Sequence, residues 1–226
     1  MTATAPTTVP TIVPTIVPNT VHAGVGDDPD ALAGIYRDEV NLAVWQRQPD
    51  PSLAAEARWL LADQGFNGLK LTLPTARLAS FDRFLPGLES CPRLRADLHL
   101  LSDMFSCLFD LQCVGLRLGA LTSAMCPKFH VDRVTCRLIC TYTGAGTEWL
   151  PNHSVDRGKL GVASGGLDDA ASGLYPSPRA IQQLAAGDVA LLKGEAWQGN
   201  EGAGLVHRSP AVETGQPRLL LTLDAM

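Results

Sequence analysis

Apolar residues recur at helical spacing in two stretches of the first half of the chain. The first spans residues 53–61, where leucine and alanine lie at i, i+4 and i+7 behind the start signal Pro51-Ser52. The second runs from Pro92 to about Leu111. Its apolar stripe consists of Leu94, Leu98, Leu101, Phe105, Leu108 and Phe109. We predict two helices here, and we expect them to serve as scaffold packed on one sheet.

After Cys113 the pattern changes to an alternation of apolar and polar residues, which is typical of half-buried strands. The alternation predicts strands over 114–118, 135–143 and 218–224, and we also expect strands over 187–193 and 206–210. In the strand over 218–224, Arg218, Leu220 and Thr222 share one face, because side chains two positions apart point to the same side of a strand. The arginine and the threonine therefore place their polar groups on the same face of this predicted strand.

Two stretches lack a periodic pattern. Residues 1–22 are rich in Thr, Pro and Val, with T-I-V-P twice in tandem, and repeated proline favours an extended tail. Residues 151–180 are rich in Gly, Ser, Asp and Pro. A long irregular insertion in a compact domain is often functional, so we predict that 151–180 form a lid or substrate-binding loop over a cavity mouth.

The H-x-D motif at His130 and Asp132 forms a candidate metal site together with His207. If residues 128–132 are extended, the first two ligands point to one side of the strand. Two imidazoles and one carboxylate can occupy one face of an octahedral metal and leave the other face open, as in non-haem Fe(II) oxygenases. Arg218 follows the second histidine by eleven residues, and it is placed to hold a carboxylate of a keto-acid co-substrate.

Longer stretches of the second half resemble known families. The strand G-D-V-A-L-L at 187–192, the motif V-H-R-S-P at 206–210 and the downstream Arg218 resemble the C-terminal half of 2-oxoglutarate/Fe(II)-dependent oxygenases of the prolyl-hydroxylase-like kind. Residues 129–151 and 187–224 also resemble an uncharacterised bacterial family of domains of unknown function (DUF1826-like).

This resemblance implies a mainly β fold with additional α-helices. The core would be a double-stranded β-helix of the jelly-roll or cupin-like type, with N-terminal helices packed on one sheet. The resemblance implies that His130, Asp132 and His207 hold Fe(II), that Arg218 anchors 2-oxoglutarate, and that the activity is of the dioxygenase, hydroxylase type. It does not identify the substrate, for which we expect a small molecule or a peptide.

Further residues are candidates for the cofactor or substrate pocket. Thr222 could donate a hydrogen bond to the carboxylate that the arginine holds. Tyr142 and Arg137 lie on opposite faces of their strand by parity, so one of them should face the cavity. An inward Tyr142 could bind the far carboxylate of the co-substrate. Trp149 and Trp197 flank glycine-rich turns and are candidates for the mouth of the pocket, with plain packing as the alternative.

A rival interpretation uses the same three ligands for zinc. Zn²⁺ suits such a ligand set in a tetrahedral site, and it binds more tightly than Fe²⁺ at equal availability. The chain could then be a zinc-binding or metal-homeostasis protein without turnover, and Cys126 and Cys136 could join the site. A cupin-like binding module with a degenerate metal site is a third possibility. Arg218 discriminates, because an oxygenase needs a carboxylate anchor and a zinc store does not.

Length and composition fit one domain. The chain has 226 residues, 46% of them hydrophobic, and a formal net charge of -5. We expect a tail over 1–22 and a single domain over 23–226, with a helical part over about 50–112 and a β core over about 113–226. An acidic chain without a basic stripe argues against nucleic acid, and no apolar run approaches the roughly 18 residues of a membrane span. We expect a soluble cytoplasmic protein and leave its oligomeric state open.

Overall fold

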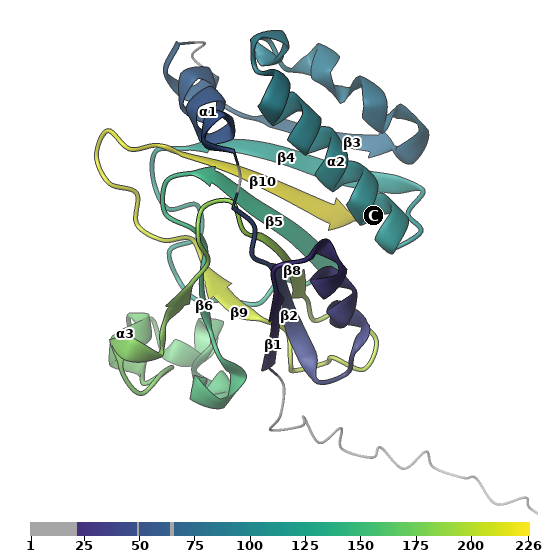
Figure 1. Ribbon diagram of the computed structural model, residues 1–226. Coiled ribbons are helices and arrows are strands. Elements are labelled where there is room, and N and C mark those ends of the chain that lie inside the picture. Colours follow the sequence, from purple (N-terminus) through teal and green to yellow (C-terminus); the bar gives the residue numbers. More distant parts are fainter. Residues whose placement is uncertain (1–21, 49, 64–65) are drawn as a thin grey trace, which may run out of the picture.

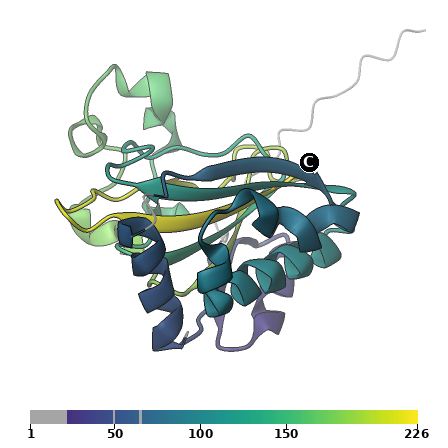
Figure 2. The ribbon, with the colours of Figure 1, turned by 90° about the horizontal axis from the view of Figure 1, so that it is seen from above.

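The computed structural model describes residues 22–226 except 49, 64 and 65. Its centre is a pair of β-sheets, and two long helices lie on one side of the larger sheet (Figure 1, Figure 2). The larger sheet therefore has an outer face, which these helices cover, and an inner face, which is turned towards the smaller sheet.

Among the described residues, the larger sheet has seven strands in the order β1-β2-β8-β5-β10-β4-β3. Their bounds are β1 (His22–Gly26), β2 (Val40–Trp45), β8 (Val189–Lys193), β5 (Cys136–Thr143), β10 (Arg218–Ala225), β4 (Cys113–Leu121) and β3 (Leu69–Pro74). All neighbouring strands are antiparallel except the parallel pair of β1 and β2. The C-terminal strand β10 lies inside the sheet between β5 and β4, and its first six residues are buried.

The smaller sheet contains β7 (Gln182–Gln183), β6 (Glu148–Leu150) and β9 (Val206–Arg208), in the order β7-β6-β9. His130 forms an isolated antiparallel bridge with His207 of β9. Two backbone hydrogen bonds of 3.0 Å hold this bridge. The two histidines therefore start from neighbouring backbone positions, although 77 residues of sequence separate them.

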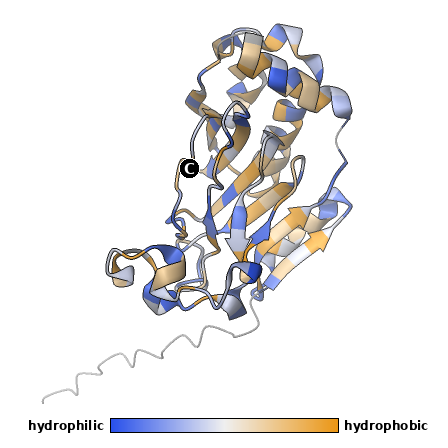
Figure 3. Cartoon of the chain, turned by 90° about the vertical axis from the view of Figure 1, so that its left-hand side faces the viewer, coloured by the Kyte–Doolittle hydropathy of each residue, from blue (hydrophilic) through white to orange (hydrophobic). Residues whose placement is uncertain are grey.

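Helices cover the outer face of the larger sheet. The long ones are α1 (Pro51–Asp63) and α2 (Pro92–Leu108), and the 3₁₀ helices on the N-terminal side of β4 are Pro29–Tyr36, Thr75–Phe84 and Leu88–Ser90. The buried stripe of α2 belongs to the same apolar cluster as Leu219, Leu221 and Leu223 of β10. Figure 3 shows hydrophobic residues along the strands of the larger sheet, with more polar residues on the peripheral helices and turns.

A second apolar cluster fills the space between the sheets. Its buried members are Leu42, Val44, Leu121, Ile139, Leu184, Ala190, Leu192, Leu205 and Leu220. Leu220 thus faces inwards, whereas Leu219 and Leu221 face the helices, as the alternation of a strand requires. Arg218 and Thr222 have the parity of Leu220, so both belong to the inner face.

The predicted helices and the strands from β4 onward are present, with ends that differ by up to about three residues. Residues 128–132 are an exception, because they form only the single bridge at His130 and no strand. The N-terminal part is also not purely helical, since β1, β2 and β3 add three strands to the larger sheet. β2 was hard to detect because it is buried on both faces and therefore lacks alternation.

Residues 151–180 contain only short helical turns, and they lie beside β6 (Figure 1). These turns are Asn152–Ser154, Arg157–Lys159, Gly161–Ser164, α3 (Asp169–Ser172) and Pro178–Ala180. Leu174 and Tyr175 of this segment pack with Phe129, Leu150 and Val206 in a third apolar cluster. The segment therefore packs against the residues that flank His130 and His207, and it contributes no residue to the lining of the cavity described below. Asp169 of the segment lies 3.5 Å from Arg208, which does line that cavity, and the lid or substrate-binding loop stays a prediction.

The extended tail predicted for residues 1–22 lies outside the described residues, except for His22, which begins β1. None of the helices in the described part of the chain combines the length and apolar character that crossing a bilayer requires. The strand that begins at His22, β1, lies at one edge of the larger sheet.

Candidate functional site

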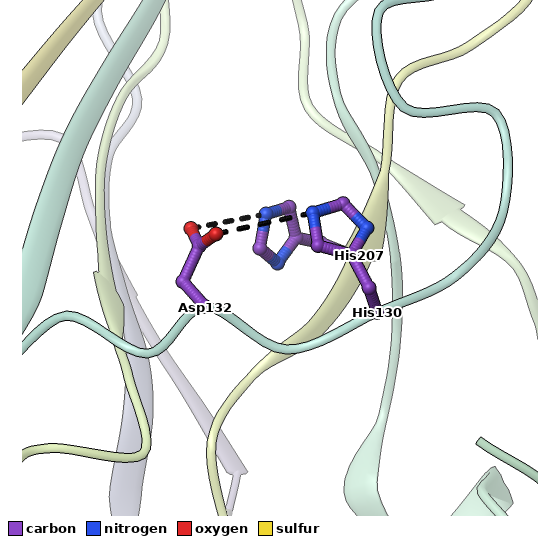
Figure 4. A group of neighbouring side chains, drawn as sticks. All are labelled: His130, Asp132 and His207. Atoms are coloured by element: carbon purple, nitrogen blue, oxygen red, sulfur yellow. Dashed lines mark ion pairs between the residues drawn. The ribbon is translucent and has the colours of Figure 1, made fainter. Parts of the chain in front are cut away.

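Three side chains with metal-binding atoms meet at the β-bridge between His130 and His207 of β9 (Figure 4). One ligand atom from each of His130, Asp132 and His207 lies within 4.8 Å of the other two. Oxygen atoms of Asp132 lie 3.4 Å from Nε2 of His207 and 3.9 Å from Nε2 of His130. The structure thus brings the three predicted ligands together, with Asp132 supplied by an irregular segment.

Both imidazole rings direct Nε2 towards the cluster, because backbone carbonyls hold their other nitrogen. Nδ1 of His130 lies 3.0 Å from the carbonyl oxygen of Lys128, and Nδ1 of His207 lies 3.0 Å from that of Leu205. A carbonyl oxygen can only accept, so Nδ1 donates and Nε2 keeps its lone pair. Burial and the neighbouring His207 also lower the pKa of His130, which favours the neutral ligating form.

Arg137 orients the third ligand. Its Nη1 donates to Oδ2 of Asp132 at 2.7 Å, while its Nε and Nη2 donate to Asp224 at 2.6 and 3.0 Å. Burial disfavours the charged form of Asp132, but the adjacent ring of His207, the guanidinium of Arg137 and the ring of His130 together outweigh it and lower the pKa to about 2. Asp132 is therefore an anionic ligand at neutral pH, and its orientation is fixed.

A cavity of about 210 Å³ opens from these ligands into the space between the sheets, and we call it the site cavity. Ile139, Leu220 and Thr222 line it from the larger sheet, and His207 and Ser209 line it from the opposite side. The other lining residues are Arg117, Met125, Cys126, His130, Asp132, Arg137, Thr147 and Arg208. Two sequence candidates, Thr222 and Arg137, thus contribute to the wall.

Arg218 is a buried cation beside this cavity, with 1% of its surface exposed. Its Nη1 donates to Oγ of Ser209 at 2.8 Å, its Nη2 lies 3.5 Å from Oγ1 of Thr141, and its Nε has no hydrogen-bond partner among the described residues. The nearby charge of Glu148 acts on it, but that carboxylate is bound by Arg208 at 2.6 Å. Burial lowers the pKa of Arg218 to about 10, so it still carries its charge at neutral pH.

The surroundings of Arg218 contain residues that sequence reasoning missed. Ser209, which binds the guanidinium, also lines the site cavity. Thr141 has the parity of Arg137 on β5, so a consistent use of strand alternation would have found it. Gly144 has φ +85°, and a Cβ atom there would lie 2.6 Å from Cγ of Arg218. Only glycine fits this place, because it tolerates the positive φ and leaves room for the arginine.

Tyr142 does not reach the site cavity. It has the opposite parity to Arg137 on β5 and packs in the outer apolar cluster beneath the helices. Burial raises the pKa of its hydroxyl well above the ordinary value, and the nearby Cys140 and Asp97 act in the same direction. Of the two parity alternatives, the structure therefore places Arg137 on the cavity side, and the expectation that Tyr142 binds the co-substrate is corrected.

The two tryptophan candidates do not line the cavity either. Trp197 packs against the outer cluster, where its ring lies 4.7 Å from Nζ of Lys193 and 5.6 Å from the ring of Tyr36. Trp149 is paired with His207 across β6 and β9, and it packs against the apolar cluster between the sheets. For both residues the packing alternative describes the structure, although Trp149 lies on the side of the sheet that carries a ligand.

Comparisons with known proteins agree with this architecture. The family described as Protein of unknown function (DUF1826) matches residues 26–224. A dioxygenase for auxin oxidation from rice has a TM-score of 0.50 at 15% sequence identity, covering 91% of this chain and 83% of that chain. A dioxygenase for auxin oxidation from Arabidopsis thaliana, solved with 2-oxoglutarate, has a TM-score of 0.51 at 11% identity, covering 91% and 92%. At such identities the likeness concerns the fold alone. No curated protein matches the chain in sequence.

Proposed function

We propose that this chain, which belongs to the family Protein of unknown function (DUF1826), is an Fe(II)- and 2-oxoglutarate-dependent oxygenase of the hydroxylase type. One observation carries the proposal: a His/Asp/His cluster lines the site cavity, and a buried arginine that forms no ion pair with the described residues donates to Ser209, which lines the same cavity. The cluster alone would suit several metals and roles. The arginine adds a requirement for an anionic ligand.

In this proposal the two sheets form a double-stranded β-helix core, and the N-terminal helices are packed on its outer face. The likeness of the fold to the two dioxygenases supports this arrangement. So does the position of the ligands, because β9 and its bridge hold His130 and His207 against the inner face of the larger sheet.

The donor atoms fit Fe(II). Nε2 of His130, Nε2 of His207 and a carboxylate oxygen of Asp132 would hold the ion, as two neutral nitrogens and one anionic oxygen on one side. This ligand set leaves the cavity side of an octahedral ion open. Arg137 would keep Asp132 in place, and such outer partners typically change metal affinity 10–100-fold.

The surroundings of Arg218 fit a carboxylate. A desolvated guanidinium with a free Nε and a neighbouring hydroxyl offers the planar donor fork that a carboxylate accepts. 2-Oxoglutarate has two carboxylates, so one would lie at the metal and the other on Arg218 and Ser209. Thr222 lines the same cavity and is a further candidate donor to the bound co-substrate.

When bound, Fe(II) and 2-oxoglutarate supply the oxidation of a substrate C–H bond by O₂, with succinate and CO₂ as co-products. The chain's own residues orient the metal ligand, bind the co-substrate and exclude water. Arg137 holds the anionic Asp132, and Arg218 binds the co-substrate. The apolar wall that includes Ile139 and Leu220 excludes water. The substrate of this reaction would be a small molecule or a peptide.

Zinc binding without turnover is the alternative that the same three ligands allow. Cys136 is buried in the outer cluster, so it is on the wrong face of β5 to join the site. Cys126 lines the cavity but does not belong to the ligand cluster found among the described residues. Arg218 favours the oxygenase, since a zinc store has no use for a buried cation beside the metal.

The test compares metal content, by elemental analysis, with 2-oxoglutarate affinity, by calorimetry on Mn(II)-loaded protein. Asp132→Ala should lower metal affinity more than about 100-fold, because it removes the only anionic ligand of the three. Arg218→Met should retain metal and lower 2-oxoglutarate affinity about 100-fold, which corresponds to roughly 2.8 kcal/mol for a buried charged contact. Arg83→Ala, an exposed residue of the 3₁₀ helix Thr75–Phe84, is the control and should change neither.

Fe(II)-loaded wild-type protein should also consume 2-oxoglutarate slowly without any substrate. If the wild type binds no 2-oxoglutarate with either Fe(II) or Mn(II), the oxygenase proposal fails. Retention of Zn²⁺ in that case would make zinc binding the better interpretation. Loss of metal in Arg218→Met would also contradict the proposal, because the arginine would then act through the metal cluster or the fold.

A further inference from the structure

Four residues lie in a row across the inner face of the larger sheet, and two of them, Lys70 and Arg117, are charged. Lys70 of β3 is paired with Arg117 of β4, Arg117 with Thr222 of β10, and Thr222 with Ile139 of β5. Residues directly opposite one another in neighbouring strands point to the same side of the sheet. Because Arg117, Thr222 and Ile139 line the site cavity, this row leads outward from the metal cluster to two cations.

The two cations at the outer end of the row have no counter-charge. Lys70 and Arg117 are exposed, and the side chain of neither forms a hydrogen bond or ion pair with the described residues. Like charges directly opposite each other in a sheet destabilise it. The nearest carboxylate on the same face of β10, that of Asp224, is already bound by two nitrogens of Arg137. The fold therefore places two positive side chains together without neutralising them.

A hollow of about 240 Å³ adjoins these cations. Its walls include Lys70, Thr72, Arg117 and Asp224. It shares Arg117, Met125, Arg137 and Thr222 with the site cavity. A molecule in this hollow would thus contact the same side chains that line the approach to His130, Asp132 and His207.

Protection of a sheet edge does not explain the pair. A lysine on β3 could discourage edge-to-edge association, because β3 is an edge strand. Arg117, however, lies on β4, which has β10 and β3 on its two sides. General surface charge does not explain it either, because the chain as a whole has a formal net charge of -5.

We propose that the hollow between β3, β4 and β10 binds the anionic group of the oxygenase's substrate, with Arg117 and Lys70 as its ligands. The inference rests on the proposed function, because it treats the metal cluster as the reacting centre. The substrate class is a small organic anion with a carboxylate or phosphate. Arg117 would hold the anionic group through its planar fork, and Lys70 would add a second charge from the edge strand.

The experiment uses the full chain loaded with Mn(II) and saturated with 2-oxoglutarate. The probes are phenylacetate, phenyl phosphate and the neutral isostere phenylacetamide. Paramagnetic broadening of their proton NMR signals by Mn(II) reports binding near the metal without any turnover. We expect at least one anion to bind about tenfold more tightly than the amide, because charge-assisted hydrogen bonds are stronger than neutral ones. The better of the two anions identifies the preferred head group.

Variants separate the two cations from general electrostatics. Arg117→Ala and Lys70→Ala should each weaken anion binding about fivefold to tenfold, and the affinity of phenylacetamide should change less than about twofold. Arg117→Lys should restore part of the loss, since it keeps the charge but not the fork. Arg83→Ala removes an exposed arginine outside the hollow and should leave all three affinities unchanged.

Equal binding of anions and amide, or no broadening of either anion, would overturn the inference while leaving the proposed function intact. Displacement of 2-oxoglutarate by the anions would also overturn it, because the anions would then occupy the surroundings of Arg218. Failure of the Mn(II)-loaded wild type to bind 2-oxoglutarate at the outset would instead refute the proposed function, and the subsite would fall with it.

Discussion

Two arginines, the buried Arg218 and the largely buried Arg47, lie on opposite faces of the same sheet, and their surroundings differ. On the outer face, Arg47 donates to both oxygens of Asp97 in α2, at 2.5 and 2.7 Å, and to the carbonyl of Gly187 at 2.7 Å. On the inner face, Arg218 donates to the hydroxyl of Ser209, and its Nε has no partner. Arg47 is neutralised within the fold, whereas Arg218 is not.

This difference separates the scaffold from the site. The Arg47–Asp97 pair ties α2 to the end of β2, so its charges serve the packing of the helices on the outer face. A buried charge that forms no ion pair opposes folding, and Arg218 has only hydroxyl groups as direct hydrogen-bond partners within the described residues. Four substitutions test whether the two arginines divide in this way.

Removing Arg47 should have the largest effect on stability. Arg47→Met leaves the carboxylate of Asp97 buried without its cation, which costs about 3–5 kcal/mol in the free energy of unfolding. Chemical denaturation measures the loss. The double variant Arg47→Met/Asp97→Leu should recover most of it, since no charge is then left unpaired. A loss below about 1 kcal/mol for the single variant would contradict the scaffold role.

Arg137 combines a scaffold contact with a site contact, because it is paired with Asp224 and also holds the candidate metal ligand Asp132. Arg137→Gln should weaken metal binding about 10–100-fold, as expected when an outer partner of a ligand is lost. Mn(II) titration followed by electron paramagnetic resonance measures the affinity. Unchanged metal affinity would show that Asp132 keeps its orientation without the arginine.

Gly144→Ala should disturb Arg218 without changing its charge. The new Cβ would lie 2.6 Å from Cγ of Arg218, and the positive φ of +85° adds strain, which together cost about 1–2 kcal/mol. We expect 2-oxoglutarate affinity to fall about tenfold. Gly165→Ala is the matched control, because φ is +63° there and nothing lies within 4 Å of the added atom. The control should lose stability but not affinity.

Arg218→Met should have the smallest effect on stability, and the sign should be opposite to that of Arg47→Met. Replacing an unpaired buried cation by an apolar side chain of similar size should raise the free energy of unfolding of the ligand-free protein by about 1 kcal/mol. Thermal unfolding without metal or 2-oxoglutarate measures the change. Destabilisation as large as that of Arg47→Met would mean that Arg218 serves the scaffold after all.

The sequence alone determined the features that depend on local periodicity and residue type. Helical spacing located α1 and α2, alternation located β4, β5 and β10, and the short apolar run after Gly187-Asp188 located β8. Alternation also placed Arg218 and Thr222 on one face of β10, because that parity is a property of the strand itself. The H-x-D motif with His207 identified three candidate ligands, and the structure brings them together.

Only the tertiary structure decided which segments and faces meet. The parity of β5 separated Tyr142 from Arg137, but the packing of α2 made the face of Tyr142 the outer one. The row from Lys70 to Arg117 depends on the register of β3 against β4, which are 39 or more residues apart. Local pattern contains no information on such register or on which face a helix covers, because both are set by contacts between distant segments.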